Sequence, residues 1–562
     1  MTVQDTAIVK PRAADIAIGE SFGWTCHVSG GVTVWFNGWI EGLDGAGLAT
    51  RLAGERSTPA RIGTWLRDVD GHFAFVAAGS DWAVAAVDWI RSIPLAACRI
   101  GGSWRIDAQP ERLRRAAGLG ARDHDADAAL AIAMAGYTVD HAALYRGIEL
   151  LAPGELFWIG PDGEGSRHRY YTDRPWQVRA GDAAAREEEL ADTTLAIMRR
   201  MVASLGGRPL VVPLSAGRDS RLVASAARHL GYDNVVCFSY GRAGNFEAEA
   251  ARTVAEKLGY PWHFVPATIA RQRAFFAGED YGRYLTFADS TASAPFVQDM
   301  APLMQLKRSG AVADDAVIVN GNTGDFITGN HVVPALQRAP SGLDREQRLK
   351  RIIDALIAKH FMLWQSLLTT QNSARIADLL RRSLERSGAS LGDPASDHGL
   401  YEYAEFQDRQ CKYVVTGQRI YEFLGHSWRL PLWDNAYLRF WEGVPLEDKV
   451  NQRLYARVLE KTNWGGVWRG IPVNDKRVRP RWLVPLRLAA KAMHAPFGRD
   501  RWHAFERHYL QYWMEATCNP ACVPYAQVCR DRRGARHHIA WLAAQYLARH
   551  GIEIDEFAAE AA

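Results

Sequence analysis

The sequence predicts an α+β domain built as a β-rich sandwich, followed by an α/β domain on a parallel sheet and a helical C-terminal part. Residues 20–165 show short alternating stretches separated by Gly, Asp and Pro turns, which is typical of a sandwich. Residues 209–335 alternate apolar runs with helical patterns, which indicates parallel strands joined by right-handed crossovers. Residues 345–470 have mostly helical patterns.

Turn-forming residues divide the chain into domains. Residues 170–179 include Pro175 and are expected to form a linker. Residues 183–204, acidic first and basic later, predict a long helix that leads into the second domain. We therefore expect a first domain over 1–170, a second over 180–470, and a basic, mostly helical extension over 471–562.

The overall composition predicts a cytoplasmic enzyme. A length of 562 residues suits two or three domains, and 48% hydrophobic and 23% charged residues are ordinary globular values. The net charge of +4 is too small to indicate a nucleic-acid partner. The seven cysteines are odd in number and scattered, which favours a reducing compartment. We see no apolar run of signal-peptide or bilayer-spanning length.

A loop of small and hydroxyl residues follows the apolar run 209–214 and precedes a helical pattern over 218–230. It reads Leu-Ser-Ala-Gly-Arg-Asp-Ser-Arg over 214–221, and this strand–loop–helix order predicts a phosphate site at the helix N-terminus. Asp219 would repel a bare phosphate, so it indicates a bridging Mg²⁺. The alternative is a simple N-cap and tight turn.

A second loop has the same character. The apolar run 316–319 precedes Asn-Gly-Asn-Thr-Gly-Asp over residues 320–325. Loops at the carboxyl ends of parallel strands face one crevice, which is where open α/β sheets bind ligands. We therefore expect Asp219 and Asp325 to share Mg²⁺ on one nucleotide.

These motifs resemble the asparagine-synthetase group. Ser215-x-Gly-x-Asp-Ser220 is similar to its pyrophosphate loop, and residues 321–329 to its second loop. Residues 238–241 resemble its adenine-contacting strand end. The resemblance implies an adenine-nucleotide α-hydrolase-like (PP-loop) fold that binds ATP and Mg²⁺. It implies catalytic roles for Asp219, Asp325 and Asn322, metal binding by Asp219 and Asp325, and nucleotide contacts from Leu214, Ser215, Gly217, Asp219, Ser220, Phe238, Ser239, Tyr240, Gly241, Glu247, Gly321, Asn322, Thr323 and Gly324.

The N-terminal third resembles the glutaminase domain of the same family in degenerate form. The resemblance rests on Phe36-Asn-Gly38, Gly71-His-Phe-Ala-Phe75, Asp88 to Leu95, and Gly147 to Gly154. The family nucleophile is an N-terminal cysteine whose α-amine is the base. This chain begins Met-Thr-Val, and its first cysteine is Cys26. We therefore expect no hydrolysis of glutamine.

Other positions depart from the family pattern or leave two interpretations open. Asn322 replaces the family glutamate, so it can orient groups but cannot act as a base, and Phe326 replaces an acidic residue. The predicted helix 408–423 either has a solvated face or lines the acceptor site. Arg429 and Asp434 are expected to pair and hold a turn. Lys476 is a candidate for the lysine beside the leaving pyrophosphate.

Residues 476–501 alternate basic with apolar side chains and contain a single acidic residue, Asp500. One interpretation is a surface helix whose long basic side chains cover apolar surface. The other is a patch that rests on anionic lipid, which would place the protein peripherally at the inner face of a membrane.

The function predicted from the family resemblance is ATP-dependent amide formation, with release of AMP and pyrophosphate and with ammonia or an amine as nitrogen donor. The motif set looks most like members encoded with bacterial surface-polysaccharide genes, which favours amidation of a uronic acid, free or on a lipid-linked glycan. The alternatives are intramolecular cyclisation, as in β-lactam synthetases and lasso-peptide cyclases, and asparagine synthesis from free ammonia. A non-catalytic scaffold and a tRNA-modifying relative are less compatible with the two aspartates and the low net charge.

Overall fold

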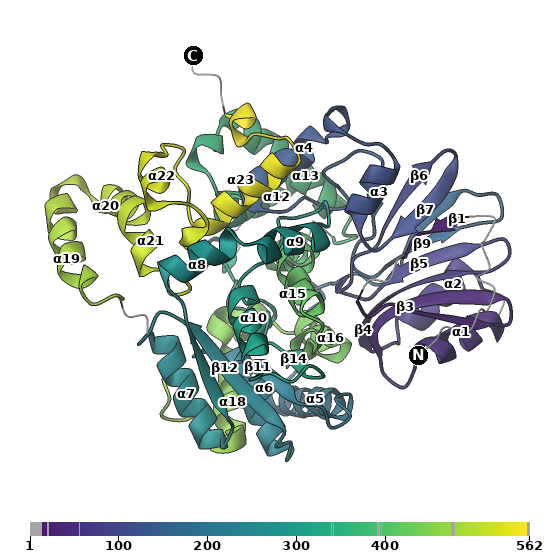
Figure 1. Ribbon diagram of the computed structural model, residues 1–562, viewed down its shortest axis with the longest axis horizontal. Coiled ribbons are helices and arrows are strands. Elements are labelled where there is room, and N and C mark those ends of the chain that lie inside the picture. The colour runs from purple at the N-terminus through teal and green to yellow at the C-terminus, as the bar shows by residue number, and fades with distance from the viewer. Residues whose placement is uncertain are drawn as a thin grey trace.

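The structure is a computed structural model that describes residues 14–18, 22–54, 57–338, 340, 342–390, 394, 396–473 and 478–558. Its elements fall into an N-terminal part with two sheets, a central part with one parallel sheet, and a helical C-terminal part (Figure 1). This is the predicted order. The domain boundaries stay predictions, although β10 ends at Arg169 and α5 begins at Ala183.

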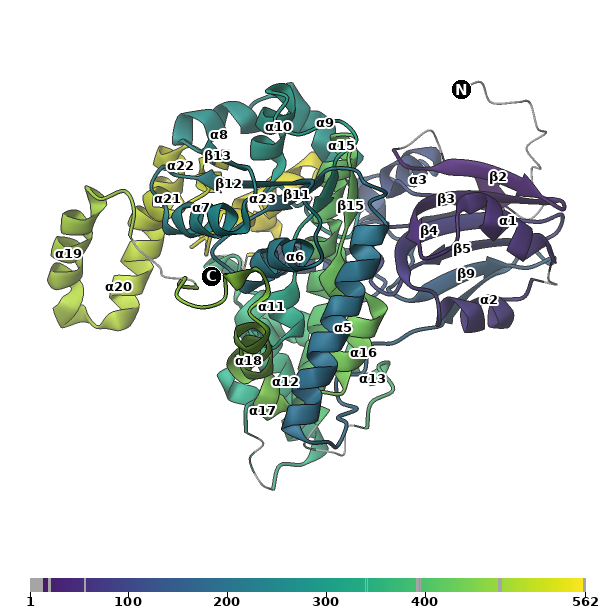
Figure 2. The same cartoon turned by 90° about the horizontal axis from the view of Figure 1, so that it is seen from below.

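The N-terminal part stacks a mainly antiparallel four-stranded sheet on an antiparallel six-stranded one, with helices outside (Figures 1 and 2). The central strands are continuous apolar runs rather than alternating ones, because both of their faces are covered: every residue of β5, Ala83–Val87, is buried. The strand orders are β1(Ala14–Ile16)-β7(Ser103–Asp107)-β6(Ala96–Ile100)-β8(Ile148–Leu150) and β10(Gly165–Arg169)-β9(Glu155–Ile159)-β5-β4(Gly71–Ala78)-β3(Val32–Ile40)-β2(Thr25–Ser29), and the helices are α1(Gly45–Gly54), α2(Pro59–Leu66), α3(Pro110–Ala116) and α4(Ala126–Ala135).

The central part contains five parallel strands in the order β13(Trp262–Pro266)-β12(Val235–Gly241)-β11(Leu210–Pro213)-β14(Val317–Val319)-β15(Ser427–Arg429). Leu210 of β11 pairs with Val235 on one side and with Val317 on the other. The chain leaves β11 toward one edge of the sheet and later returns to its other side. The carboxyl end of β11 is therefore a topological switch point, where a ligand crevice is expected.

Helices surround this sheet, and α5(Ala183–Ala203) leads into β11 as predicted. The others are α6(Arg218–His229), α7(Phe246–Leu258), α8(Ile269–Phe276), α9(Glu279–Phe287), α10(Met300–Arg308), α11(Gly324–Ile327), α12(Arg345–His360), α13(Thr370–Glu385), α14(Ser396–Glu405), α15(Arg419–Phe423), α16(Asn435–Glu442), α17(Leu446–Lys449) and α18(Arg453–Thr462). Glu247, one of the predicted nucleotide contacts, lies in the first turn of α7.

Residues 408–423 are not one continuous α-helix, and the interpretation of a solvated face is wrong, whereas the interpretation that they line the acceptor site stays a prediction. Residues 406–414 are π-helical, residues 415–418 form a 3₁₀ turn, and only α15 follows as α-helix. Lys412 and Arg419 are both buried, and each has an acidic partner. Lys412 Nζ lies 2.9 Å from the carboxylate of Asp408, and Arg419 pairs with Glu422. These cations lie in internal ion pairs and not on a solvated face.

Arg429 and Asp434 do not form the predicted pair. Arg429 Nε donates to Ser204 Oγ at 2.8 Å, and Asp434 accepts from Arg200 at 2.6 and 2.7 Å. Asp434 also caps α16 by accepting from the Ala436 N–H. Both residues therefore hold the fold, through other partners, where the first domain meets the parallel sheet.

The C-terminal part contains α19(Leu483–His494), α20(Arg499–Phe505), α21(Gln511–Met514), α22(Tyr525–Arg530) and α23(His538–Arg549). The last helix lies against α4 of the first domain, whereas α19 and α20 project from the body in both views (Figures 1 and 2). Within the described ranges, no helix combines the length and apolar character needed to cross a bilayer.

Candidate active site

The first predicted loop connects β11 to α6 and is held by two hydroxyl groups. Ser220 Oγ accepts from the Ser215 N–H at 3.0 Å and lies 3.1 Å from Ser215 Oγ, which in turn accepts from the Gly217 N–H. Gly217 precedes α6 and has no side chain that could cap it. The first N–H groups of α6 therefore find no side-chain acceptor at the cap, as an anion site requires.

The second loop connects β14 to α11 and lies directly on the first. A Cβ on Gly321 would lie 2.5 Å from the Ser220 nitrogen, and one on Gly324 would lie 2.7 Å from the Asp219 carboxylate. Only glycine permits this approach at both positions. Side chains behind the loop fix it, because Thr323 donates to Gln410 at 2.8 Å and the Asn322 N–H donates to Asn320.

The two predicted aspartates meet where the loops touch. Asp219 accepts from the Asp325 N–H at 2.8 Å and from the Tyr455 hydroxyl at 3.1 Å. Burial, and then the negative charge of Asp325, raise the pKa of Asp219 to about 8. Burial also opposes ionisation of Asp325, but the hydrogen bond and charge of His331 outweigh it and lower the pKa of Asp325. The pair concentrates negative charge that a cation would neutralise.

A pocket of about 180 Å³ opens between these loops and the end of β12. Ser239 at this strand end donates to the Leu214 carbonyl at 2.7 Å, and Tyr240 donates to Asp299 at 2.5 Å. The structure places ten of the predicted nucleotide-contacting residues on the pocket wall: Leu214, Ser215, Gly217, Asp219, Ser220, Ser239, Tyr240, Glu247, Gly321 and Asn322.

Four predicted contacts do not line the pocket. Phe238 is fully buried in the sheet core, and Gly241 lies against the carbonyl of Ala516 instead. Thr323 is turned toward Gln410, and Gly324 packs on Asp219. The family resemblance implied that all of 238–241 contact the nucleotide, but Phe238 packs into the core and the segment around Ala516 covers Gly241.

The sequence did not predict several wall residues, and the C-terminal extension supplies two of them, Ala516 and Thr517. The Ala516 carbonyl accepts from the Arg242 N–H at 2.8 Å, and the Thr517 carbonyl accepts from Gln272 at 3.0 Å. No motif marks this segment, so sequence alone gave no signal for it. The other unpredicted wall residues are Pro213, Ala248, Phe296, Gln298, Asp299 and Asn320, of which Asn320 could have been found because it directly follows a strand.

A buried carboxylate–imidazole array supports the second loop from behind. His331 Nε2 lies 3.3 Å from Asp325 Oδ2, and its other ring nitrogen pairs with Glu405. Glu405 also interacts with His360 at 3.0 Å and with Gln410 at 3.0 Å. These positive and hydrogen-bonding neighbours outweigh burial and hold the pKa of Glu405 well below its usual range. The array fixes the position of Asp325.

Lys476, the candidate for the lysine beside the leaving pyrophosphate, lies outside the described residues.

Comparison with protein families now assigns the central part of the chain. Residues 192–462 match the family model described as asparagine synthase. This region belongs to the asparagine synthase family. The matched asparagine synthase domain contains all five parallel strands, both loops and Tyr455.

Other comparisons add little to the asparagine synthase assignment. None of the curated proteins matches the chain. Among solved structures, the chain is similar to glutamine phosphoribosylpyrophosphate amidotransferase from B. subtilis complexed with ADP and GMP, with 13% identity and a TM-score of 0.18. That similarity covers 53% of this chain and 57% of the other, little more than half of its length, and a score this low supports no structural argument.

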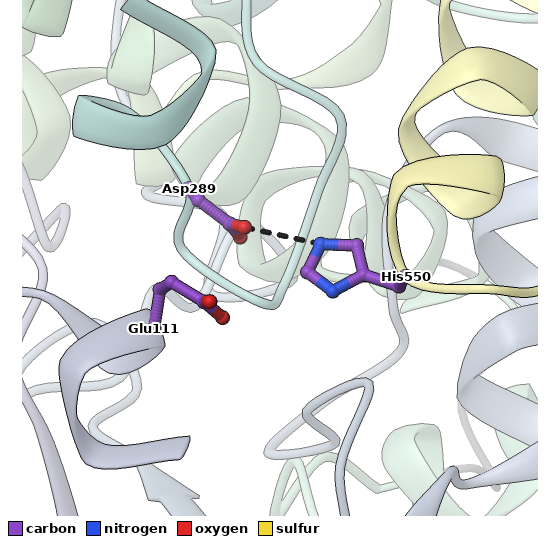
Figure 3. Close-up of side chains that lie close together, drawn as sticks. All are labelled: Glu111, Asp289 and His550. Carbon is purple, nitrogen blue, oxygen red and sulfur yellow. Dashed lines mark ion pairs between the residues drawn. The ribbon is translucent and has the colours of Figure 1, made fainter. Parts of the chain in front are cut away.

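A second cluster of ligand-type side chains joins three parts of the chain (Figure 3). His550 of the extension lies 3.0 Å from Asp289 and 2.8 Å from the Tyr145 hydroxyl. Glu111 of the first domain already binds Arg114 and Arg115. These groups are engaged with protein partners. Through Asp289 and Tyr145, His550 connects the end of α23 to the asparagine synthase domain and to the first domain.

Proposed function

We propose that the protein is an ATP-dependent ligase that forms an amide by activating a carboxylate as its acyl adenylate. One observation carries the proposal: Asp219 and Asp325 meet at the uncapped N-terminus of α6, at the switch point of an asparagine synthase domain. The family match supports an ATP-dependent amide-forming ligase in general. The release of AMP and the identity of the acceptor are parts of our proposal.

The loop residues have defined tasks in this reaction. A carboxylate oxygen attacks the α-phosphorus of ATP, and the bond from that phosphorus to the pyrophosphate oxygen breaks. The hydroxyls of Ser215 and Ser220 and the free N–H groups of α6 hold the departing pyrophosphate. A nitrogen nucleophile then attacks the acyl carbon, loses a proton and expels AMP.

The residues present fit a magnesium ion. Mg²⁺ prefers a few carboxylate oxygens together with substrate phosphates, and the carboxylates of Asp219 and Asp325 lie close enough for the charge of Asp325 to raise the pKa of Asp219. Burial and the charge of Asp325 raise the pKa of Asp219 despite the nearby charge of Arg218, so a bound cation would stabilise its ionised form. When bound, the ion would neutralise charge on the phosphates.

We further propose that this chain does not hydrolyse glutamine and that nitrogen comes from free ammonia or an amine. The two cysteines of the first domain support this proposal. Cys26 lies within β2 and Cys98 within β6, so the nitrogen of each is part of a peptide bond and cannot serve as an α-amine base.

For the acceptor we propose a uronic acid of a bacterial surface glycan. Two observations support this acceptor. The motif set resembles that of family members encoded with bacterial surface-polysaccharide genes, and the second loop carries less negative charge than the family pattern. Asn322 and Phe326 are neutral where the family pattern is acidic, and Asn322 lines the pocket. A neutral wall repels an anionic acceptor less than a carboxylate would.

An isotope experiment tests adenylation directly. The protein is incubated with ATP, Mg²⁺, ammonia and uronic acids labelled with ¹⁸O in the carboxylate, and AMP is analysed by mass spectrometry. We expect one ¹⁸O in each AMP, because the attacking oxygen stays on phosphorus when the amide forms. Release of ADP, or AMP without label, would overturn the acyl-adenylate mechanism. Labelled AMP with aspartate but not with uronic acids would overturn only the acceptor.

A further inference from the structure

The helical arm formed by residues 481–505 exposes an unusual amount of apolar surface. It contains α19 and α20 and projects from the body of the molecule (Figures 1 and 2). Seven large hydrophobic side chains in the described part of the chain are exposed, and five of them belong to this arm: Trp482 (55%), Leu486 (56%), Leu488 (58%), Met493 (71%) and Phe497 (60%). Such clustering marks an interaction surface.

The helix α19 packs against the rest of the arm through one set of side chains and exposes a different, apolar set. The helix uses another face for packing: Leu483 is buried, Arg487 pairs with Glu506 at 2.5 Å, and the ring of His494 lies 4.4 Å from that of Phe505. These contacts use one side of the helix, and most of the remaining side chains along it are exposed. Trp482, Leu486, Met493 and Phe497 follow at helical spacing, so they form one apolar stripe along the arm.

Positive charge surrounds this stripe. Arg481, Lys491, Arg499 and Arg501 are exposed and make no ion pair with any described residue, whereas Asp500 is the one exposed acidic residue between 478 and 505. Glu506, the next acidic residue, is engaged by Arg487. A partner must therefore offer an apolar layer and negative charge side by side.

We propose that the arm docks on the surface of a membrane that contains anionic phospholipids. The apolar stripe would enter the boundary between headgroups and acyl chains, and the four free cations would contact lipid phosphates. An acidic protein surface would match the charges, but the apolar half of α19 would then need a groove of equal length. A lipid surface satisfies both requirements along the whole arm.

Vesicle flotation with the full chain tests this proposal. We expect the protein to float with vesicles of phosphatidylcholine and phosphatidylglycerol and to stay behind with phosphatidylcholine alone. Removal of two cations in K491Q/R499Q should weaken binding by about fivefold for each charge. The triple variant L486S/M493S/F497S should lose at least about tenfold, because its apolar stripe is gone. Added salt should weaken binding of the wild type.

Matched variants elsewhere on the surface serve as controls. R252Q/K257Q on α7 removes two exposed cations, and V178S removes an exposed apolar side chain; both should bind like the wild type. All altered residues are exposed, so the melting temperatures should be unchanged. Equal binding of the triple variant, or no binding of the wild type to anionic vesicles, would overturn the proposal. Arm-dependent self-association without vesicle binding, seen by sedimentation, would identify a second copy as the partner.

Discussion

Asp88 directly follows β5 in the first domain, and Asp219 lies in the first turn of α6, after β11, in the asparagine synthase domain; the two carboxylates have different surroundings. Asp88 accepts from the N–H groups of Phe73, Ile90 and Ser92 and from the Ser92 hydroxyl. These donors come from its own loop and from β4, and the carboxylate is buried. Asp219 lines a pocket and lies close to the negative charge of Asp325.

The charge of the neighbours, rather than burial, distinguishes the two sites. Burial raises both pKa values, that of Asp88 to about 6 and that of Asp219 to about 8. Four hydrogen bonds oppose the shift at Asp88, whereas the charge of Asp325 adds to it at Asp219. An aspartate whose charge is satisfied by hydrogen bonds therefore stabilises the fold, and one placed against a like charge is available to a ligand.

The largest effect is expected from Asp219→Asn. Formation of AMP and pyrophosphate should fall by about 10³-fold, because half of the charge that binds the metal and phosphates is lost. The folded state should lose little stability, because relief of a buried like-charge contact offsets the hydrogen bond that the new amide loses to Tyr455 or to the Asp325 N–H. Pyrophosphate release and thermal unfolding, measured on the same sample, check both parts. A variant within a few-fold of wild-type turnover would exclude the metal role.

Asp88→Asn should have the opposite profile. The new amide NH₂ would face the N–H and O–H donors that now bind the carboxylate, so unfolding should require about 3 kcal/mol less free energy. The KM for ATP should not change. Denaturant titration gives the stability, and steady-state kinetics at a temperature where the variant is folded gives the KM. A raised KM with normal stability would show that the first domain takes part in the nucleotide site.

His72 makes the contact between the two regions sensitive to acid. Its Nε2 lies 3.4 Å from the Trp433 carbonyl, and burial, together with the charge of Arg429, lowers its pKa to about 4. The unfolded chain therefore binds a proton near pH 6.5 that the folded chain does not. The stability contributed by neutral His72 is present above pH 6.5 and is lost as the pH falls toward 4, by up to about 3 kcal/mol.

The substitution His72→Gln isolates this contribution, because glutamine can still donate to the carbonyl but does not titrate. We expect the variant to lose less stability than the wild type between pH 7 and pH 4.5. Urea unfolding at several pH values gives the comparison. Parallel pH profiles for the two proteins would mean that another group causes the acid sensitivity.

A smaller effect is expected from Asn322→Glu. A carboxylate at this position would restore the family residue but add a third negative charge beside Asp219 and Asp325, so the KM for ATP should rise about tenfold. Asn322→Gln, which adds length without charge, should change the KM far less. A faster Asn322→Glu enzyme with a new ionisation near neutral pH would show instead that the loop retains the family's proton-transfer geometry.

The strand–loop–helix patterns predicted the parallel sheet and the meeting of the two loops that carry Asp219 and Asp325, because glycine, hydroxyl and carboxylate residues after apolar runs constrain local geometry strongly. Asp219 lines the pocket, and Asp325 lies beside it without lining it. Long-range contacts could not be predicted in this way. Nothing near Ala516 or Thr517 indicates that they meet β12, and His331 shows no sign of Glu405 as its partner. Helix 408–423 was misjudged because its charged residues find buried partners such as Asp408 and Glu422, which amphipathic spacing cannot reveal.

The most direct test is the shift in melting temperature caused by Mg²⁺-ATP in the wild type, Asp219→Asn and Asp88→Asn. A ligand that binds the folded state raises its melting temperature in proportion to the binding free energy. We predict a clear shift in the wild type, an equal shift from a lower starting temperature in Asp88→Asn, and almost none in Asp219→Asn, which should start close to the wild-type temperature. A full shift in Asp219→Asn, or a lost shift in Asp88→Asn, would contradict the division of roles between the two regions.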